Sequence, residues 1–190
     1  MATELEYQAK IRSYDWEQLQ DLWQAIKEKD TPEWANGKAL EYLIIRAFEL
    51  ENAEVRYPYS VPLDTISTNE GKHDIEQIDG VVYTRNLSCL IECKDTQKAI
   101  DFEPISKLRS QLMRRPSTAI ASIFSLSGFS YPALMLLNFI QPQTILAWEK
   151  DEIEYCLEHQ NFCESLVKKY HQAVESGTYS FSIIDRGDLL

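Results

Sequence analysis

The stretch Gln77-Ile78-Asp79-Gly80-Val81-Val82-Tyr83 and the nearby stretch Leu90-Ile91-Glu92-Cys93-Lys94 predict two adjacent strands. Side chains alternate between the two faces of a strand, so Glu92 and Lys94 should project from the same side. If the two strands pair as a hairpin, Asp79 converges with Glu92 and Lys94 at one place. The sequence therefore predicts a small cluster of two carboxylates and one ammonium group.

This cluster has the groups that hydrolysis of a phosphodiester bond requires. The carboxylates of Asp79 and Glu92 could hold a hard divalent cation through their oxygens. The ammonium group of Lys94 could orient an attacking water or help to deprotonate it. An alternative interpretation is that Glu92 and Lys94 form only a structural ion pair. Asp74 and Glu76 are further carboxylates nearby, but their strand parity places them opposite Asp79.

Two motifs in the chain resemble a known family. Asp79 followed by Glu92-x-Lys94 at the end of an apolar strand resembles the PD-(D/E)xK nuclease superfamily, whose fold is restriction-endonuclease-like. Ile78 stands where the family name has proline. The stretch Gly37-Lys38-Ala39-Leu40-Glu41-Tyr42-Leu43 is similar to the first helix of the Mrr-like branch, where a glutamate joins the metal site. The resemblance covers roughly residues 37 to 148.

The resemblance implies an α/β sandwich with a mixed central β-sheet flanked by helices. It also implies a Mg²⁺-dependent endonuclease that acts on DNA in defence or repair, with Mn²⁺ as a substitute cation. Asp79 and Glu92 would be metal ligands, together with the backbone carbonyl of Cys93. Lys94 would position or activate water, and Glu41 would complete the site directly or through water. DNA or RNA as the substrate stays open, and the alternative is a non-catalytic interaction module of the same fold in a multiprotein complex.

Composition is that of an ordinary globular protein. The 190 residues predict one domain, with an N-terminal helix at about 14–29, a core at about 37–148 and a helical region at 149–190. No apolar run approaches the roughly 18 residues that span a membrane, and the first residues do not resemble a secretory signal. We therefore expect a cytoplasmic protein with reduced cysteines and no membrane partner, as a homodimer or in a complex. A bond between Cys156 and Cys163 stays open.

The net charge of −11 weighs against nucleic-acid binding, which usually needs a positive surface. The charge is unevenly distributed, because residues 94–115 contain six basic and three acidic side chains. We expect phosphate contacts from this segment. Arg114 and Arg115 could instead be a solvated helix end, where the helix dipole favours positive charge. The predicted nucleic-acid-binding residues are Lys107, Arg109, Arg114 and Arg115.

Residues 38–51 predict a strong helix in which Glu41 lies within the apolar arc. Burying a lone carboxylate is costly unless it is paired or bound to a metal. The alternative is that Glu41 lies at the edge of the arc and reaches water. A further helix is predicted to begin near Thr31-Pro32-Glu33. The remaining predictions are strands at 54–61, 75–83, 87–94, 119–126, 144–148 and 179–184, and helices at 103–115, 130–139 and 149–176 with an interruption near 159–160.

Overall fold

The computed structural model describes residues 3–62, 74–139 and 141–184. The helices are α1 (Glu4–Arg12), α2 (Trp16–Glu28), α3 (Lys38–Leu50), α4 (Phe102–Leu112), α5 (Tyr131–Phe139), α6 (Lys150–His159) and α7 (Phe162–Ser176). The strands are β1 (Glu54–Arg56), β2 (Tyr59–Pro62), β3 (Asp74–Ile78), β4 (Gly80–Thr84), β5 (Leu87–Lys94), β6 (Ala119–Ser125) and β7 (Ile145–Glu149).

A five-stranded mixed sheet forms the centre of the molecule, with the strand order β1-β4-β5-β6-β7. β1, β4 and β5 pair antiparallel, whereas β5, β6 and β7 pair parallel. Parallel pairs need a crossover connection, which α4 and α5 provide here. β5 and β6 are apolar on both faces and buried along most of their length, as expected for strands between two helical layers.

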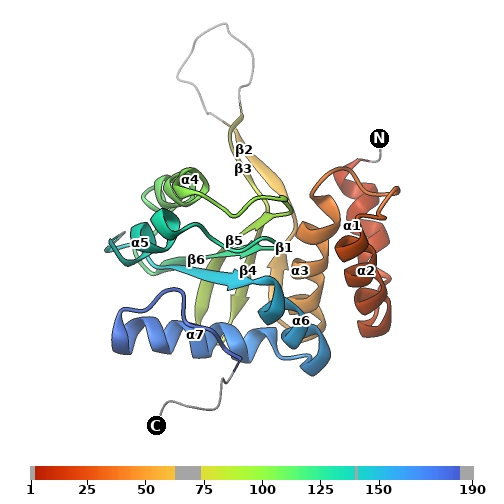
Figure 1. Ribbon diagram of the computed structural model, residues 1–190. Coiled ribbons are helices and arrows are strands. Elements are labelled where there is room, and N and C mark those ends of the chain that lie inside the picture. Colours follow the sequence, from red (N-terminus) through yellow and green to blue (C-terminus); the bar gives the residue numbers. More distant parts are fainter. Residues whose placement is uncertain (1–2, 63–73, 140, 185–190) are drawn as a thin grey trace, which may run out of the picture.

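Helices cover both faces of this sheet (Figure 1). α4 packs on one face against β6 and β7, with α5 beside it. On the other face α3 contacts β4 and β5, and α6 and α7 contact the parallel strands. α1 and α2 form an outer layer on α3. This arrangement confirms the α/β sandwich with a mixed central sheet flanked by helices.

The burial of α3 follows from its position between the sheet and the outer helices. Its buried residues run from Ala39 to Phe48, with Arg46 as the exception. A helix that is apolar on nearly all sides is one that the protein encloses. Glu41 is therefore carried into the interior, and only 9% of this residue is exposed. The expectation that Glu41 faces the protein is confirmed.

β2 and β3 form a separate two-stranded ribbon that projects from the sheet (Figure 1). The prediction of uninterrupted strands at 54–61 and 75–83 was wrong, because both are broken at the base of this ribbon. Proline has no backbone N–H and cannot donate to a strand ladder, so pairing stops at Pro58. On the opposite chain segment the break falls at Asp79, which separates β3 from β4.

The N-terminal region differs from the prediction in two respects. The predicted helix at 14–29 is α2, but α1 precedes it and was missed because only Tyr7 and Ile11 are buried on that helix. Thr31 does not begin a helix, since α3 starts only after Gly37. The φ of Gly37 is +80°, a left-handed conformation that glycine adopts without steric cost.

The C-terminal segment was predicted to form a strand at 179–184, and this was wrong. The segment has no strand pairing, although the carbonyl of Tyr179 accepts a hydrogen bond of 3.0 Å from the N–H of Ala147. Lys169 is buried, pairs with Glu152 at 2.7 Å and also binds a backbone carbonyl of this segment. The tail is therefore held by side chains rather than by a ladder.

The four cysteines are free and buried: Cys89, Cys93, Cys156 and Cys163. Cys156 and Cys163, whose pairing the sequence left open, are thus separate thiols. Burial raises the pKa of Cys156 to about 12 and that of Cys163 to about 11, so neither is an activated nucleophile. None of the described helices combines the length and the apolarity needed to cross a membrane.

Candidate metal centre

Asp79 and Glu92 meet at the junction between the sheet and the ribbon. β4 and β5 pair antiparallel as far as Gly80 and Ile91, so Asp79 and Glu92 stand opposite each other one step further along. The N–H of Cys93 donates a hydrogen bond of 2.9 Å to Oδ2 of Asp79. Asp79 is 6% exposed and Glu92 is 1% exposed. The expected hairpin is confirmed, and it places Asp79, which directly precedes β4, beside the end of β5 that carries Glu92.

Two lysines approach Glu92. Lys94 of β5 forms an ion pair with its Oε1, and the Nζ of Lys107 in α4 lies 3.6 Å from the same oxygen. Burial lowers the pKa of Lys94, but the charge and hydrogen bond of Glu92 and the charge of Asp79 together outweigh this effect, and the resulting pKa lies above the ordinary lysine value. The expected same-face position of Glu92 and Lys94 is confirmed. The ion pair exists, and it leaves both the structural and the metal-site interpretation open.

Gly80 explains how α3 comes so close to these residues. A Cβ at this position would lie 2.2 Å from Cδ1 of Ile45 and 3.2 Å from the carbonyl oxygen of Arg56. Only glycine leaves room for the fully buried Ile45 against the strand. Glu41 lies one helical turn before Ile45 on α3, so this close packing brings its carboxylate toward the junction.

Glu41 has its own cationic partner. The Nζ of Lys38 lies 2.8 Å from Oε2 of Glu41 and 3.0 Å from Oε1 of Glu4 in α1. Burial raises the pKa of Glu41, and the ion pair with Lys38 opposes this effect only in part. The Glu41 carboxylate is thus a buried acid that one lysine partly neutralises.

The cluster contains several carboxylates that are buried, so little solvent is available to stabilise their negative charges. Burial, together with the neighbouring charges of Glu92 and Glu41, raises the pKa of Asp79 to about 7, and the hydrogen bond from the Cys93 N–H opposes this shift. These influences show that the three carboxylates lie within electrostatic reach of one another. A cation bound among these carboxylates would offset their mutual repulsion.

The donor set limits which metal could bind. Within residues 3–62, 74–139 and 141–184, no three His, Cys, Asp or Glu side chains are close enough together to hold a metal ion. Asp79 and Glu92 offer two carboxylates, and Glu41 is held by Lys38. Mg²⁺ commonly binds to one or two protein carboxylates and keeps several waters, so the residues present fit this cation. They do not provide the full cage of a structural metal site.

Sequence reasoning considered the pair of Glu92 with Lys94 but missed two further lysine partners, Lys38 of Glu41 and Lys107 of Glu92. The spacing of Lys38 and Glu41 by three residues on one helix is a signal that could have identified the first pair. Lys107 was predicted as a phosphate contact, but its approach to Glu92 depends on how α4 packs after the crossover. No local pattern in the chain encodes that contact.

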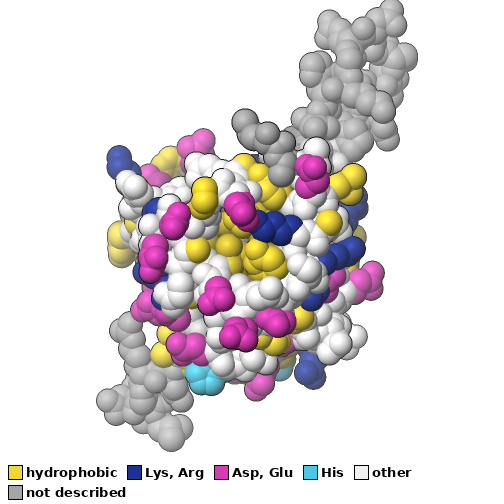
Figure 2. All heavy atoms as spheres, turned by 90° about the vertical axis from the view of Figure 1, so that its right-hand side faces the viewer, with side chains coloured by type: hydrophobic (Ala, Val, Ile, Leu, Met, Phe, Trp, Pro, Cys, Tyr) yellow, Lys and Arg dark blue, Asp and Glu magenta, His cyan; other side chains and the backbone are white. Residues whose placement is uncertain are grey.

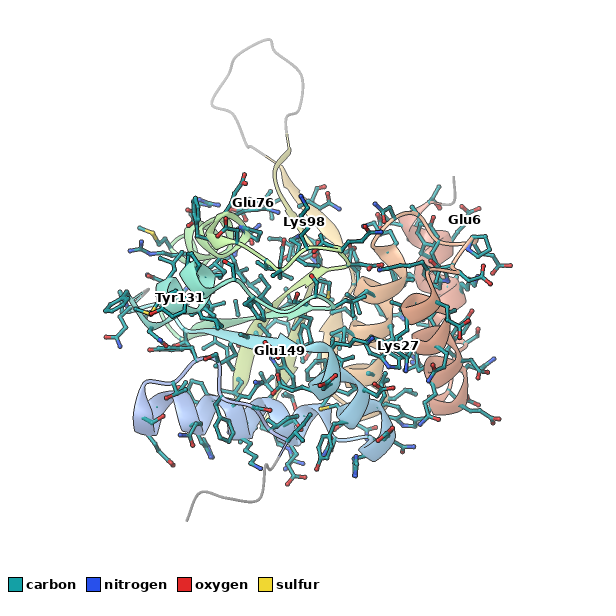
Figure 3. All side chains as sticks on the ribbon, in the orientation of Figure 1. Glu6, Lys27, Glu76, Lys98, Tyr131 and Glu149 are labelled. Atoms are coloured by element: carbon teal, nitrogen blue, oxygen red, sulfur yellow. The ribbon has the colours of Figure 1, made fainter. Side chains whose placement is uncertain are left out.

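Arg114 and Arg115 are engaged within the protein. Both pair with Glu76 of β3, and Nη2 of Arg115 lies 2.6 Å from Oε2 of that residue. Glu76 is only 6% exposed, and it lies beside α4 at the base of the ribbon (Figure 3). The two arginines therefore fasten the ribbon to the end of α4. The pair is therefore more than a solvated helix end, although Arg114 is half exposed, and Glu76 pairs with arginine rather than with the metal cluster.

A groove of about 620 Å³ opens beside Lys94. Asn36, Lys98 and Pro104 contribute to its lining, together with the loop at 95–101. Lys107 and Arg109 are exposed on the neighbouring α4. The Lys94 end of the cluster therefore borders this groove.

Comparisons with known proteins give weak likenesses. No known family model matches the chain, and no curated protein matches it in sequence. The small subunit (R.BspD6I2) of the heterodimeric restriction endonuclease R.BspD6I is 16% identical, with a TM-score of 0.48, over 82% of this chain and 94% of that one. A protein of unknown function, AF1548, is 16% identical, with a TM-score of 0.44, over 60% of this chain and 59% of that one. Neither comparison tests the resemblance to the Mrr-like branch.

Proposed function

We propose that this protein is a Mg²⁺-dependent endonuclease of the restriction-endonuclease-like superfamily that hydrolyses phosphodiester bonds in DNA. The observation that carries the proposal is the position of Asp79 opposite Glu92, with Lys94 on the same strand face as Glu92. All three lie at the end of paired strands, where a groove reaches Lys94. Perturbed carboxylates beside a lysine that borders a groove are typical of active sites.

Asp79 and Glu92 would hold the cation, with the Cys93 carbonyl as a third protein ligand and Mn²⁺ as a substitute. Bound there, Mg²⁺ would offset the charge that develops on the phosphate. Burial and the charges of Glu92 and Glu41 raise the pKa of Asp79, and this supports the assignment because a bound cation would offset those negative charges. Glu41 would complete the site directly or through water, as in the Mrr-like branch that the helix at 37–43 resembles.

Lys94 would act on the water and the phosphate. Its raised pKa keeps the ammonium group charged at neutral pH. An ammonium group at this position can orient the attacking water and stabilise developing negative charge. Lys107, which shares Glu92 with Lys94, would contact the neighbouring phosphates together with Arg109, Arg114 and Arg115. Contacts of this kind position a nucleic acid without reading its sequence.

A second candidate is a non-catalytic module of the same fold that acts in a multiprotein complex or as a homodimer. The net charge of −11 favours this candidate, because it opposes association with a polyanion. The intact set of Asp79, Glu92 and Lys94 favours the enzyme. A cleavage assay separates the two functions.

The assay combines purified protein and Mg²⁺ or Mn²⁺ with supercoiled, linear, branched and single-stranded DNA, and with RNA. We expect Lys94→Ala to lower the cleavage rate by about 10²–10³ while DNA binding persists, because one group that faces the developing charge is lost. Lys168→Ala, an exposed lysine on α7, is the matched control and should cleave normally. Full activity in Lys94→Ala would contradict the assignment. Bound metal without cleavage of any substrate would favour the interaction module.

A further inference from the structure

α2 and the segments directly before and after it line an open pocket that shares no residue with the candidate metal centre. Its volume is about 420 Å³, and its apolar wall comes from Tyr14, from Leu22 and Ala25 of α2, and from Pro32 and Trp34 in the segment before α3. Figure 2 looks onto this side of the molecule, where apolar side chains gather near the centre among acidic ones. A pocket of this volume is large enough for one or two bulky side chains of a ligand.

The rim of this pocket is acidic. Asp21, Asp30 and Glu33 surround the apolar wall. In the part of the chain that the structure describes, neither Asp21 nor Asp30 pairs with a basic side chain. Two uncompensated carboxylates beside an apolar hollow repel a nucleic acid and attract a positively charged ligand.

The chain itself shows that this rim accepts a cation. The Nζ of Lys10 in α1 lies 5.0 Å from the ring centroid of Trp34 and forms an ion pair with Glu33. An ammonium group over an indole ring and beside a carboxylate is a favourable arrangement. Asp21 and Asp30 offer the same kind of partner to a basic side chain from outside.

From this combination we infer that the pocket binds a basic segment of another protein. An apolar side chain of that segment enters between Leu22 and Trp34, and flanking Lys or Arg side chains pair with Asp21 and Asp30. The charge of −11 on the whole chain adds long-range attraction for such a partner. This interaction surface is independent of the nuclease proposal, because none of its residues belongs to the metal cluster.

The probe is a pair of short peptides that share a central leucine and differ only in their flanking residues, arginine in one and glutamate in the other. Binding is followed by NMR through the indole N–H of Trp34, with the buried Trp148 of β7 as the internal reference. We expect the arginine peptide to shift the Trp34 signal and to leave Trp148 in place. The glutamate peptide should shift neither signal.

Three variants distinguish peptide binding in this pocket from nonspecific electrostatic attraction to the acidic protein. Asp21→Asn with Asp30→Asn should weaken binding about fivefold or more, since two charge contacts are lost. Glu17→Gln with Glu28→Gln changes the net charge equally at exposed positions of α2 outside the pocket and should bind normally. Ala25→Leu fills the hollow, keeps every charge and should also weaken binding.

Several outcomes would overturn the inference. One is the absence of a Trp34 shift at millimolar arginine peptide. Others are equal binding of the two peptides, equal weakening by both charge pairs, or unchanged binding to Ala25→Leu. If a peptide of arginine without the central leucine bound as tightly, the site would be a cation site rather than a peptide pocket. None of these results depends on whether the protein cleaves DNA.

Discussion

In the metal-free protein, the negative charge of buried Asp79 lowers the stability of the folded state. Its folded pKa of about 7 lies above the ordinary value of 3.8, because of burial and the charges of Glu92 and Glu41. The folded state therefore holds this proton more tightly than the unfolded state. The stability that protonated Asp79 contributes is present at low pH and is lost as pH rises through about 7.

We therefore expect Asp79→Asn to stabilise the metal-free protein more at pH 8 than at pH 5.5, with a difference on the order of a few kcal/mol. Asparagine can still accept the hydrogen bond from the Cys93 N–H, so the local geometry is kept. Urea denaturation in a chelating buffer measures the effect. Asp21→Asn, an exposed aspartate on α2, serves as the control. Equal stabilisation by Asp79→Asn at the two pH values would show that Asp79 does not carry this charge penalty.

Glu41 is predicted to support metal binding without being needed for the fold. Glu41→Gln should weaken the binding of Mn²⁺ by roughly 10–100-fold, the range found when groups that support metal ligands are removed. Glu4→Gln is the matched control, because Glu4 also pairs with Lys38 but lies at the exposed start of α1. Calorimetry with Mn²⁺ compares the three proteins. Identical affinities in Glu41→Gln and wild type would remove Glu41 from the site.

At the scale of elements, the close approach of α3 to β4 depends on Gly80. Gly80→Ala should lower the free energy of unfolding by about 1–3 kcal/mol, because the new Cβ would overlap Ile45 in a fully packed interior. Replacing Ile45 with alanine removes the overlapping atoms. The double variant Gly80→Ala with Ile45→Ala should therefore be less destabilised than the sum of the two single variants. Simple additivity would mean that the helix does not press on the strand at this point.

The end of α4 has a structural role that complicates any test of nucleic-acid binding. Replacing Arg114 and Arg115 with alanine leaves Glu76 buried without a partner and should cost on the order of 3 kcal/mol of stability. Lys107→Ala with Arg109→Ala changes the charge equally, lies within α4 and leaves Glu76 paired with its arginines. This second pair should flatten the dependence of DNA affinity on salt while the melting temperature stays close to wild type. An unchanged salt dependence would show that α4 does not contact phosphates.

On the scale of the whole molecule, the sequence predicted the hairpin that pairs β4 with β5 because its determinants are local. Arg85 and Asn86 both have positive φ, the backbone form of a tight two-residue turn, and the turn sets the register that brings Asp79 opposite Glu92. The mixed sheet followed from strands separated by helices. The apolar surroundings of Glu41 likewise predicted its burial.

The rest depended on contacts between distant segments, which no local pattern encodes. The pairing of Glu76 with Arg114 and Arg115 arises only when the ribbon packs on α4. The break at Asp79 follows from a proline on the facing strand rather than from its own neighbours. The acidic pocket likewise combines α2 with the segment before α3, so no local pattern in the chain indicated it.

Anomalous diffraction from crystals soaked in Mn²⁺ tests whether Asp79 and Glu92 share a divalent cation. Both carboxylates are buried, Asp79 directly before β4 and Glu92 on the paired strand β5. We expect an anomalous peak between these two side chains in wild-type protein and its loss in Asp79→Ala. A well-occupied peak elsewhere, or no peak between Asp79 and Glu92 at saturating Mn²⁺, would contradict this expectation.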